Sequence, residues 1–170
     1  MAATHLLVLG NAEAVRWVFQ NQRMAFSEVG RRTAMRLSRG DTLIFYASLK
    51  CWPELGGTRP ESGLLIADAV VLTDVAQLKQ PAVVGGRHFH YGCEIFFEHL
   101  APVGSGVPIG TVRDQLELTA GRANYGQALR RTPVLLSPAD AALLTAKLQQ
   151  VWQPFDDTID GYRNIVSTQQ

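Results

Sequence analysis

The 170-residue sequence has few cysteines, few charged residues and no long hydrophobic run, and each shortage excludes a class of protein. Cys51 and Cys93 are too few for a disulfide framework, which predicts reduced thiols in a cytoplasmic protein. No run of 18 apolar residues predicts a membrane span, and the first residues lack the basic stretch and apolar core of a signal peptide. We therefore expect a folded protein without a membrane partner.

Familiar catalytic motifs are also missing. The glycine-rich patterns GxGxxG and GxxxxGK[ST] do not occur, and no serine or cysteine lies in a nucleophile-elbow context. We expect no cofactor. Hydrophobic residues make up 46% of the chain, which is enough for one ordinary core. The sequence predicts a single domain over residues 1–155 and a polar, partly ordered tail over residues 156–170.

Positive charge is concentrated in the first third of the chain. Residues 1–50 contain seven basic and three acidic side chains, although the whole chain carries a net charge of only +1. A basic surface attracts polyanions, so this distribution predicts a side that faces nucleic acid; a solvated helix face is the alternative. The candidate phosphate-binding residues are Arg23, Arg32, Arg36, Lys50 and Arg59.

Hydrophobic patterning predicts the order of the elements. Strands are expected at residues 5–10, 42–48, 63–75 and 86–99. Helices are expected at 12–22, 31–37, 109–116, 124–130 and 137–150, with loops at 23–30 and 49–62. Asn11 and Ser137 are predicted helix N-caps. Because the order does not alternate βαβα, we predict an α+β fold: a bent mixed β-sheet or small β-barrel flanked by helices.

The segment GRHFHYGCEIFFEH, residues 86–99, contains four residue types that bind zinc: His88, His90, Cys93 and His99. In an extended strand the first two point to one face and the last two to the other, so the four do not converge on one ion. We therefore expect no metal site here. A bulge at Gly92 would change this alternation and remains an alternative.

The same alternation divides the strand into two faces. The face expected to pack into the core contains Phe89, Tyr91, Cys93, Ile95 and Phe97. The face expected to line a surface or cleft contains His88, His90, Glu94, Phe96 and Glu98. Apolar neighbours make Cys93 a small buried hydrophobe and not a nucleophile.

Aromatic residues alternate with basic ones near loops and strand ends. The aromatic residues of this pattern are Trp17, Phe26, Tyr46, Trp52, Phe89 and Tyr91. Aromatic rings stack on nucleobases and guanidinium groups neutralise phosphates, so this pattern predicts nucleic-acid binding. The alternative is that the rings form the core, which we expect for Phe45, Phe96 and Phe97 but not for Trp52.

The run RMAFSEVGRRTAMRLSRGDTLIFYAS, residues 23–48, resembles the centre of EVE domains, which belong to the PUA-like superfamily and are related to YTH domains. LLVLGN before it, and GLLIADAVV and FHYGCEIFFEHLAP after it, extend the resemblance over roughly residues 5–103. The resemblance implies a bent β-barrel with a pocket that receives one flipped, modified nucleobase inside an aromatic cage.

The resemblance also implies roles for individual residues. Asn11 and Ser27 would contact the base edge, Phe26 would form one cage wall where relatives usually have Trp, and residues 88–91 would form the opposite wall. With Trp52 from the aromatic pattern, the predicted base-binding set is Asn11, Phe26, Ser27, Tyr46, Ser48, Trp52, His88, Phe89 and Tyr91. The predicted function is a non-enzymatic module that reads a methylated or hydroxymethylated base, in DNA in preference to RNA, with a nuclease or another effector as a partner.

Two alternatives remain at the level of sequence. A small PUA-like hydrolase of the ASCH type would use Lys50, Thr42 and Glu94, although the Gly-x-Lys-x-x-Glu-x-Arg signature of that family is missing. The other alternative is a plain RNA-binding module that uses only the basic face.

Overall fold

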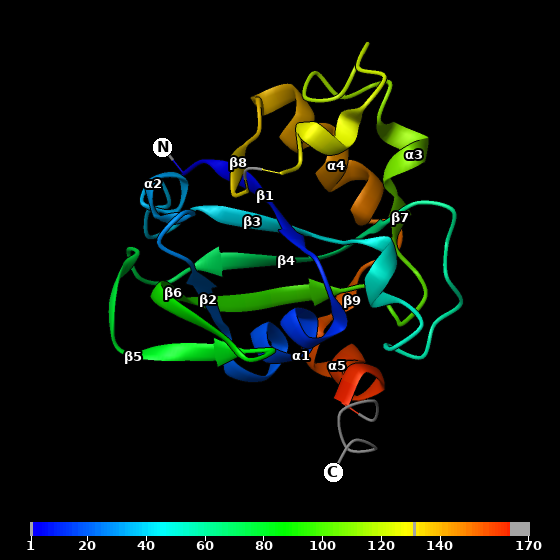
Figure 1. Ribbon diagram of the computed structural model, residues 1–170. Coiled ribbons are helices and arrows are strands. Elements are labelled where there is room, and N and C mark those ends of the chain that lie inside the picture. Colours follow the sequence, from blue (N-terminus) through cyan, green and yellow to red (C-terminus); the bar gives the residue numbers. More distant parts are fainter. Residues whose placement is uncertain (1, 131, 164–170) are drawn as a thin grey trace.

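The computed structural model describes residues 2–130 and 132–163, and the chain is built around one curled mixed sheet (Figure 1). The strands are β1 (Thr4–Leu9), β2 (Arg23–Phe26), β3 (Thr42–Ala47), β4 (Leu64–Val71), β5 (Ala76–Val84), β6 (Arg87–Leu100), β7 (Val107–Pro108), β8 (Val134–Leu135) and β9 (Gln153–Pro154). The α-helices are α1 (Ala12–Asn21), α2 (Arg31–Ala34), α3 (Ile109–Val112), α4 (Pro138–Leu148) and α5 (Phe155–Arg163). Two 3-10 turns are η1 (Leu49–Cys51) and η2 (Tyr125–Gln127).

The central order of the sheet is β2-β6-β4-β3-β1-β8, and the pairing of β1 with β3 is parallel. Strand β6 is 14 residues long and pairs with different partners along its length: β5 and β2 with its first half, β4 and β9 with its second. One strand shared in this way curls the sheet into a half-barrel. The predicted fold class, a bent mixed sheet flanked by helices, is confirmed.

The two faces of the sheet pack against different helices. Figure 1 shows α1 and α5 on one side and α3 and α4 on the other. Alternation along β3 supplies both cores, as the sequence predicts: Leu43 and Phe45 enter the core under α1 and α5, and Ile44 enters the core under α4. Both faces of this strand are therefore buried.

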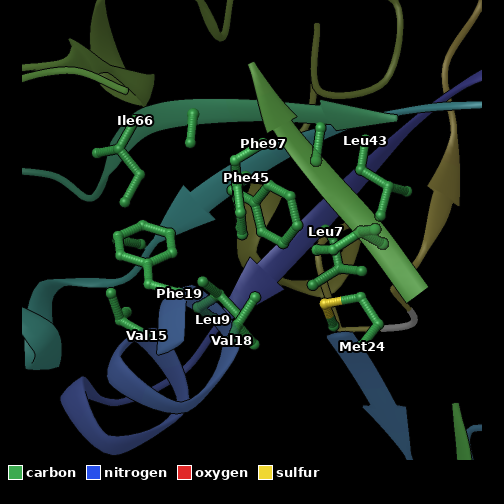
Figure 2. Packing of buried hydrophobic residues seen from close by; sticks show 14 of the residues in the cluster. Leu7, Leu9, Val15, Val18, Phe19, Met24, Leu43, Phe45, Ile66 and Phe97 are labelled. Carbon is green, nitrogen blue, oxygen red and sulfur yellow. The ribbon is translucent and has the colours of Figure 1, made fainter. Parts of the chain in front are cut away.

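Aromatic rings from four elements, α1, β3, β6 and α5, fill the core under the two helices. Figure 2 shows Phe19, Phe45 and Phe97 pointing toward one another. The ring centroids of Phe19 and Phe97 lie 5.0 Å apart, and Phe155 stacks on Phe97 at 4.8 Å. The Tyr162 hydroxyl donates a hydrogen bond to the Ala101 carbonyl at 2.7 Å. We call Phe19, Phe45, Phe97, Phe155 and Tyr162 the aromatic cluster.

Local signals in the sequence locate most elements correctly. The predicted strands correspond to β1, β3, β4 and β6, and both predicted caps form: Asn11 accepts from the Ala14 amide at 2.9 Å, and Ser137 accepts from the Asp140 amide at 3.1 Å. The predicted helices 31–37 and 109–116 are shorter, as α2 and α3, and 124–130 contains only the single turn η2.

One prediction of local structure is wrong, and two further elements, β5 and α5, are not anticipated from the sequence. Residues 23–26 are predicted as loop but form β2, because Met24 and Phe26 are buried against β6. Strand β5 is missed because most of its nine residues are exposed on both faces, and it is defined only by pairing with β6. The predicted polar tail begins with α5, whose Phe155 and Tyr162 belong to the core; residues 164–170 of that tail lie outside the described residues.

Two further observations concern exposure. Phe96, expected in the core, points to the outer face of β6 and is 54% exposed. No helix in the described part of the chain is both long and apolar enough to span a bilayer.

Candidate nucleic-acid interface

The parallel strands β1 and β3 end side by side, so the residues that follow them meet at one edge of the sheet. The backbone amide of Ser48 donates to the Leu9 carbonyl at 3.1 Å, and the Ser48 hydroxyl donates to the Gly10 carbonyl at 3.0 Å. These bonds fix the two strand ends relative to each other. Two pockets open at this edge.

The first pocket has a volume of about 430 Å³ and lies between the end of β1, helix α1, strand β2 with its following loop, and the tip of the β5–β6 hairpin. Its aromatic and polar lining includes Asn11, Trp17, Phe26, Ser27 and Phe89. Four of these five belong to the predicted base-binding set. The volume falls in the range of about 300–1,000 Å³ that is typical of small-ligand sites.

Two polar side chains in the first pocket keep donors that are unused within residues 2–130 and 132–163. The Oδ1 atom of Asn11 caps α1, so its amide nitrogen is the group left for a ligand. The Ser27 hydroxyl oxygen accepts from the Gly30 amide at 3.2 Å, and its own proton remains available. A planar ligand with acceptors along one edge would match both groups.

The rings of the first pocket come from three elements. Phe26 is mostly covered, whereas Trp17 and Phe89 are half-buried. The guanidinium carbon of Arg87 lies 5.5 Å from the centroid of the Phe89 ring, so one positive charge is held at the rim of the pocket. Sequence reasoning missed Trp17 and Arg87 as site residues. The aromatic–basic pattern includes Trp17 and could have identified it. Arg87 could have been identified because it directly precedes residues 88–91, the predicted pocket wall.

The second pocket, of about 830 Å³, adjoins the first. It is lined by Tyr46, Ser48, Lys50 and Arg59 from the predicted sets, and by Tyr125 of η2. Arg130 lines both pockets. Among the described residues no carboxylate lines either pocket, although Arg87, Arg130, Lys50 and Arg59 do. The edge therefore favours anionic ligands.

Tyr46 forms a buried wall of the second pocket and stays protonated. Burial, followed by the nearby Tyr125, raises the pKa of Tyr46 to about 12. A Cβ atom on Gly63 would overlap the Tyr46 hydroxyl, so glycine at that position makes room for the phenol. At neutral pH this phenol can donate a hydrogen bond.

Three residues of the predicted base-binding set do not line either pocket. Trp52 is fully buried because residues 49–57 fold into η1 and a tight turn, in which the Gly57 amide donates to the Trp52 carbonyl. Its prediction as a base-binding residue is corrected: the ring has no free face. His88 is exposed on the outer side of β6.

Tyr91, the third of these residues, belongs to a small network beside the first pocket. A hydrogen bond to the Glu28 carboxylate raises the pKa of Tyr91, and the Arg31 guanidinium carbon lies 5.0 Å from its ring centroid. This network connects β6 to the loop that contains Ser27. Tyr91 therefore supports a wall of the first pocket and does not line it.

The predicted phosphate-binding residues are spread over three places. Lys50 and Arg59 line the second pocket. Arg23 lies 3.9 Å from Glu94 and lines a third pocket, of about 800 Å³, between α1, β2 and β5. Arg32 and Arg36 are exposed around α2 and line none of the three pockets.

The residues of the hydrolase alternative are not brought together. Thr42 begins β3, and Lys50 follows the other end of this strand, which is about 17 Å long from its first to its last Cα atom at about 3.3 Å per residue. Glu94 lies on β6 beside Arg23. A shared cleft for Lys50, Thr42 and Glu94 is thus not formed.

The four potential zinc ligands do not converge either. His88 and His90 are exposed, whereas Cys93 is buried, and burial raises the pKa of its thiol to about 12. The bulge considered at Gly92 does not form, because Gly92 pairs regularly with β2. Strand β6 bulges instead at Glu98, between the pairs Asp68–His99 and Ala69–Phe97 that it makes with β4.

The residues of the described chain that could hold a cation are Asp68, Glu98 and His99, whose ligand atoms lie within 4.8 Å of one another. Asp68 is already paired, since it accepts from the His99 backbone amide at 2.9 Å and faces its Nδ1 atom at 3.0 Å. Burial raises the pKa of Asp68, with His99 opposing. The pair holds the bulge of β6 against β4.

Comparison with solved structures identifies the fold. The YTH domain of Zygosaccharomyces rouxii MRB1 in complex with N6-methyladenosine RNA is 12% identical over 89% of this chain and 90% of that chain, with a TM-score of 0.56. The apo YTH domain of Toxoplasma CPSF4 (10% identity, 89% of each chain, TM-score 0.55) and a hypothetical protein from Leishmania major (11%, 88% and 96%, 0.55) are similar to the same extent. The fold is that of YTH domains. No family model and no curated protein matches the sequence.

Proposed function

We propose that this protein is a non-enzymatic, EVE-like nucleic-acid reader that captures one modified base of single-stranded RNA in the first pocket. The observation that carries the proposal is the first pocket itself, which combines the rings of Trp17, Phe26 and Phe89 with the free amide of Asn11. A similar fold in the Z. rouxii YTH domain is described in complex with N6-methyladenosine RNA, which supports the choice of ligand class.

RNA takes the place of the DNA that the sequence favours. The Z. rouxii structure is described in complex with RNA, and the similarity to it gives no support for a preference for DNA. An unpaired base also avoids the few kcal/mol that flipping out of a duplex costs. Sequence-specific RNA recognition commonly uses unstacked bases on aromatic side chains.

The rings supply affinity and the polar groups supply selectivity. Stacking contributes about 1–3 kcal/mol per base, and burial of one methyl group contributes only about 0.8 kcal/mol. Methyl burial alone therefore discriminates by only several-fold. A reader must add hydrogen bonds to the base edge, and we assign this role to Asn11 and Ser27, which line the first pocket.

A reader of this kind changes no covalent bond, so it would act through a separate effector such as a nuclease. A mixture of reader and partner should cleave RNA that contains the modified base and spare its unmodified counterpart. Loss of this selectivity with Phe89→Ala would support such a pairing. Cleavage that continues without the reader would contradict it.

The test is fluorescence binding to a panel of short oligonucleotides. The panel contains N6-methyladenine, 5-methylcytosine and 5-hydroxymethylcytosine, each with its unmodified counterpart, in single-stranded RNA and in DNA. We expect one modified RNA to bind at least about 10-fold more tightly than its counterpart. Equal or absent binding across the RNA arm would contradict the proposal, and a preference confined to the DNA arm would assign the reader to DNA.

A further inference from the structure

The two pockets at the end of β1 form one continuous surface. They share Val8, Gly10, Arg130 and Thr132, so no element separates them. The first pocket alone has about half the volume of the second, and a single base would occupy only the first. The second pocket therefore stays open beside the captured base and can accept a further group of the same ligand.

The lining of the second pocket combines aromatic rings with positive charges. The Arg113 guanidinium carbon lies 5.3 Å from the centroid of the Tyr125 ring and holds that ring at the pocket. Tyr46 lies nearby with its phenol, while Lys50 and Arg59 are exposed at the rim. Rings with cations and no described carboxylate are the chemistry that binds a nucleotide, which carries a planar base and a phosphate.

Arg130 lies where the two pockets meet. Adjacent nucleotides of one strand are joined by a single phosphate. If one base occupies the first pocket and its neighbour the second, that phosphate lies at the shared boundary, beside Arg130. The positive charge of the second pocket, its continuity with the first pocket and the single phosphate between adjacent nucleotides all favour a neighbouring nucleotide as its occupant.

We propose that the second pocket binds the nucleotide adjacent to the captured base, so that the protein reads two consecutive nucleotides of an RNA strand. This inference rests on the proposed function and adds sequence context to it. Tyr125 and Tyr46 contact the neighbouring base, Lys50 and Arg59 contact its outer phosphate, and Arg130 contacts the linking phosphate. Only one neighbour, on the 5′ or the 3′ side, can reach the second pocket.

The experiment compares a modified nucleoside with its two dinucleotides. The probe is N6-methyladenosine, or the panel base that binds more tightly, alone and with one uridine on the 5′ or the 3′ side; each dinucleotide also carries a terminal phosphate on its uridine, so that both the linking and the outer phosphate are present. We expect one dinucleotide to bind about 10-fold more tightly than the nucleoside and the other to bind like the nucleoside. Equal affinity of all three probes would overturn the inference.

Two variants and one control test whether the gain in dinucleotide affinity comes from the second pocket. Tyr125→Ala, and separately the double variant Lys50→Gln with Arg59→Gln, should reduce dinucleotide affinity about 10-fold more than nucleoside affinity. The double variant changes only exposed side chains, so it guards against misfolding of Tyr125→Ala. Lys79→Gln removes an exposed charge that lines neither pocket and should change nothing.

The outcomes separate the inference from the proposed function. A dinucleotide gain that persists in both sets of variants would overturn the second pocket as its site, while nucleoside binding would leave the proposed function standing. Absence of binding of every probe to the wild-type protein would overturn the proposed function and the inference with it.

Discussion

The first pocket and the aromatic cluster are built from the same residue types, but one is open and the other is filled. Helix α1 contributes to both, with Trp17 in the pocket and Phe19 in the cluster. In the cluster, α5 brings Phe155 onto Phe97 and closes the space. The pocket is faced instead by the tip of the β5–β6 hairpin.

That difference shows what makes a binding site out of aromatic residues. The hairpin tip contains Gly85 and Gly86, both with positive φ, and neither has a side chain that could fill the pocket. A ring can form a wall of a site only where distant elements leave part of its surface uncovered. Substitutions in the closed regions should therefore affect stability, and substitutions in the open region should affect binding.

The largest expected effect is on stability, in the closed cluster. Phe97→Ala removes a ring that contacts Phe19, Phe45 and Phe155, and should lower the free energy of unfolding by about 3–5 kcal/mol. Phe96→Ala, one residue away on the exposed face, should change it by less than about 0.5 kcal/mol. Urea unfolding measures both, and similar losses would contradict the assignment of faces.

Strands β1 and β3 have a second shared end, opposite the pockets, and the polar side chains of His5 and Asp41 at that end are buried. Asp41 accepts from the Ala3 and Ser38 amides, each at 3.0 Å, and lies 3.2 Å from the His5 Nε2 atom. Asp41→Asn should destabilise the protein by about 1–3 kcal/mol at neutral pH, because it disrupts a buried network. Asp114→Asn, on an exposed side chain, is the control.

The same residue gives the stability a dependence on pH. Burial raises the pKa of Asp41, but the hydrogen bonds from Ala3, Ser38 and His5 outweigh it and lower the pKa below 3.8. The ionised carboxylate therefore stabilises the fold fully above pH 3.8, and this contribution is lost as the pH falls through the folded-state pKa. Urea unfolding between about pH 5 and pH 2.5 should show a smaller acid loss in Asp41→Asn than in the wild type.

In the open pocket, the expected effect is on binding. Phe89→Ala removes a half-buried ring and should weaken RNA binding by about 1–3 kcal/mol, the contribution of one stacked base. His88→Ala, the preceding residue outside both pockets, should leave the affinity unchanged. Equal effects of the two substitutions would show that the base does not bind in the first pocket.

Asn11 has two roles that two substitutions separate. Asn11→Ala loses the helix cap and the free amide, so it should cost about 1 kcal/mol of stability and weaken binding. Asn11→Ser keeps a capping oxygen and loses only the amide, so it should weaken binding at nearly wild-type stability. Thermal unfolding and RNA titration measure the two roles, and normal binding by Asn11→Ser would exclude the amide contact.

The smallest expected effect concerns charge at the rim. Arg87→Gln should weaken RNA binding a few-fold and lower the slope of log K against log salt by about 0.7, the value for one phosphate contact on a single strand. Arg32→Gln, on α2, should leave the slope unchanged. A lower slope for Arg32→Gln and an unchanged slope for Arg87→Gln would show that RNA phosphates contact the predicted residues on α2 and not the rim of the first pocket.

The sequence by itself determined what depends on near neighbours along the chain. Alternation assigned the faces of β3 and β6, and the side chains of Asn11 and Ser137 located two helix starts, because these signals act within a few residues. The order of strands and helices then limited the fold to a bent mixed sheet. The resemblance located Asn11, Phe26, Ser27 and Phe89, which the structure brings together.

Only the tertiary structure decided which aromatic and basic residues are free to bind. Trp52, in a Gly/Pro-rich loop, is fully buried, while Trp17, on an amphipathic helix, lines the first pocket. Arg130 reaches the same edge from more than 100 residues along the chain. Strand β5 and helix α5 likewise depend on distant partners. Burial and convergence are set by contacts between distant residues, which no local pattern contains.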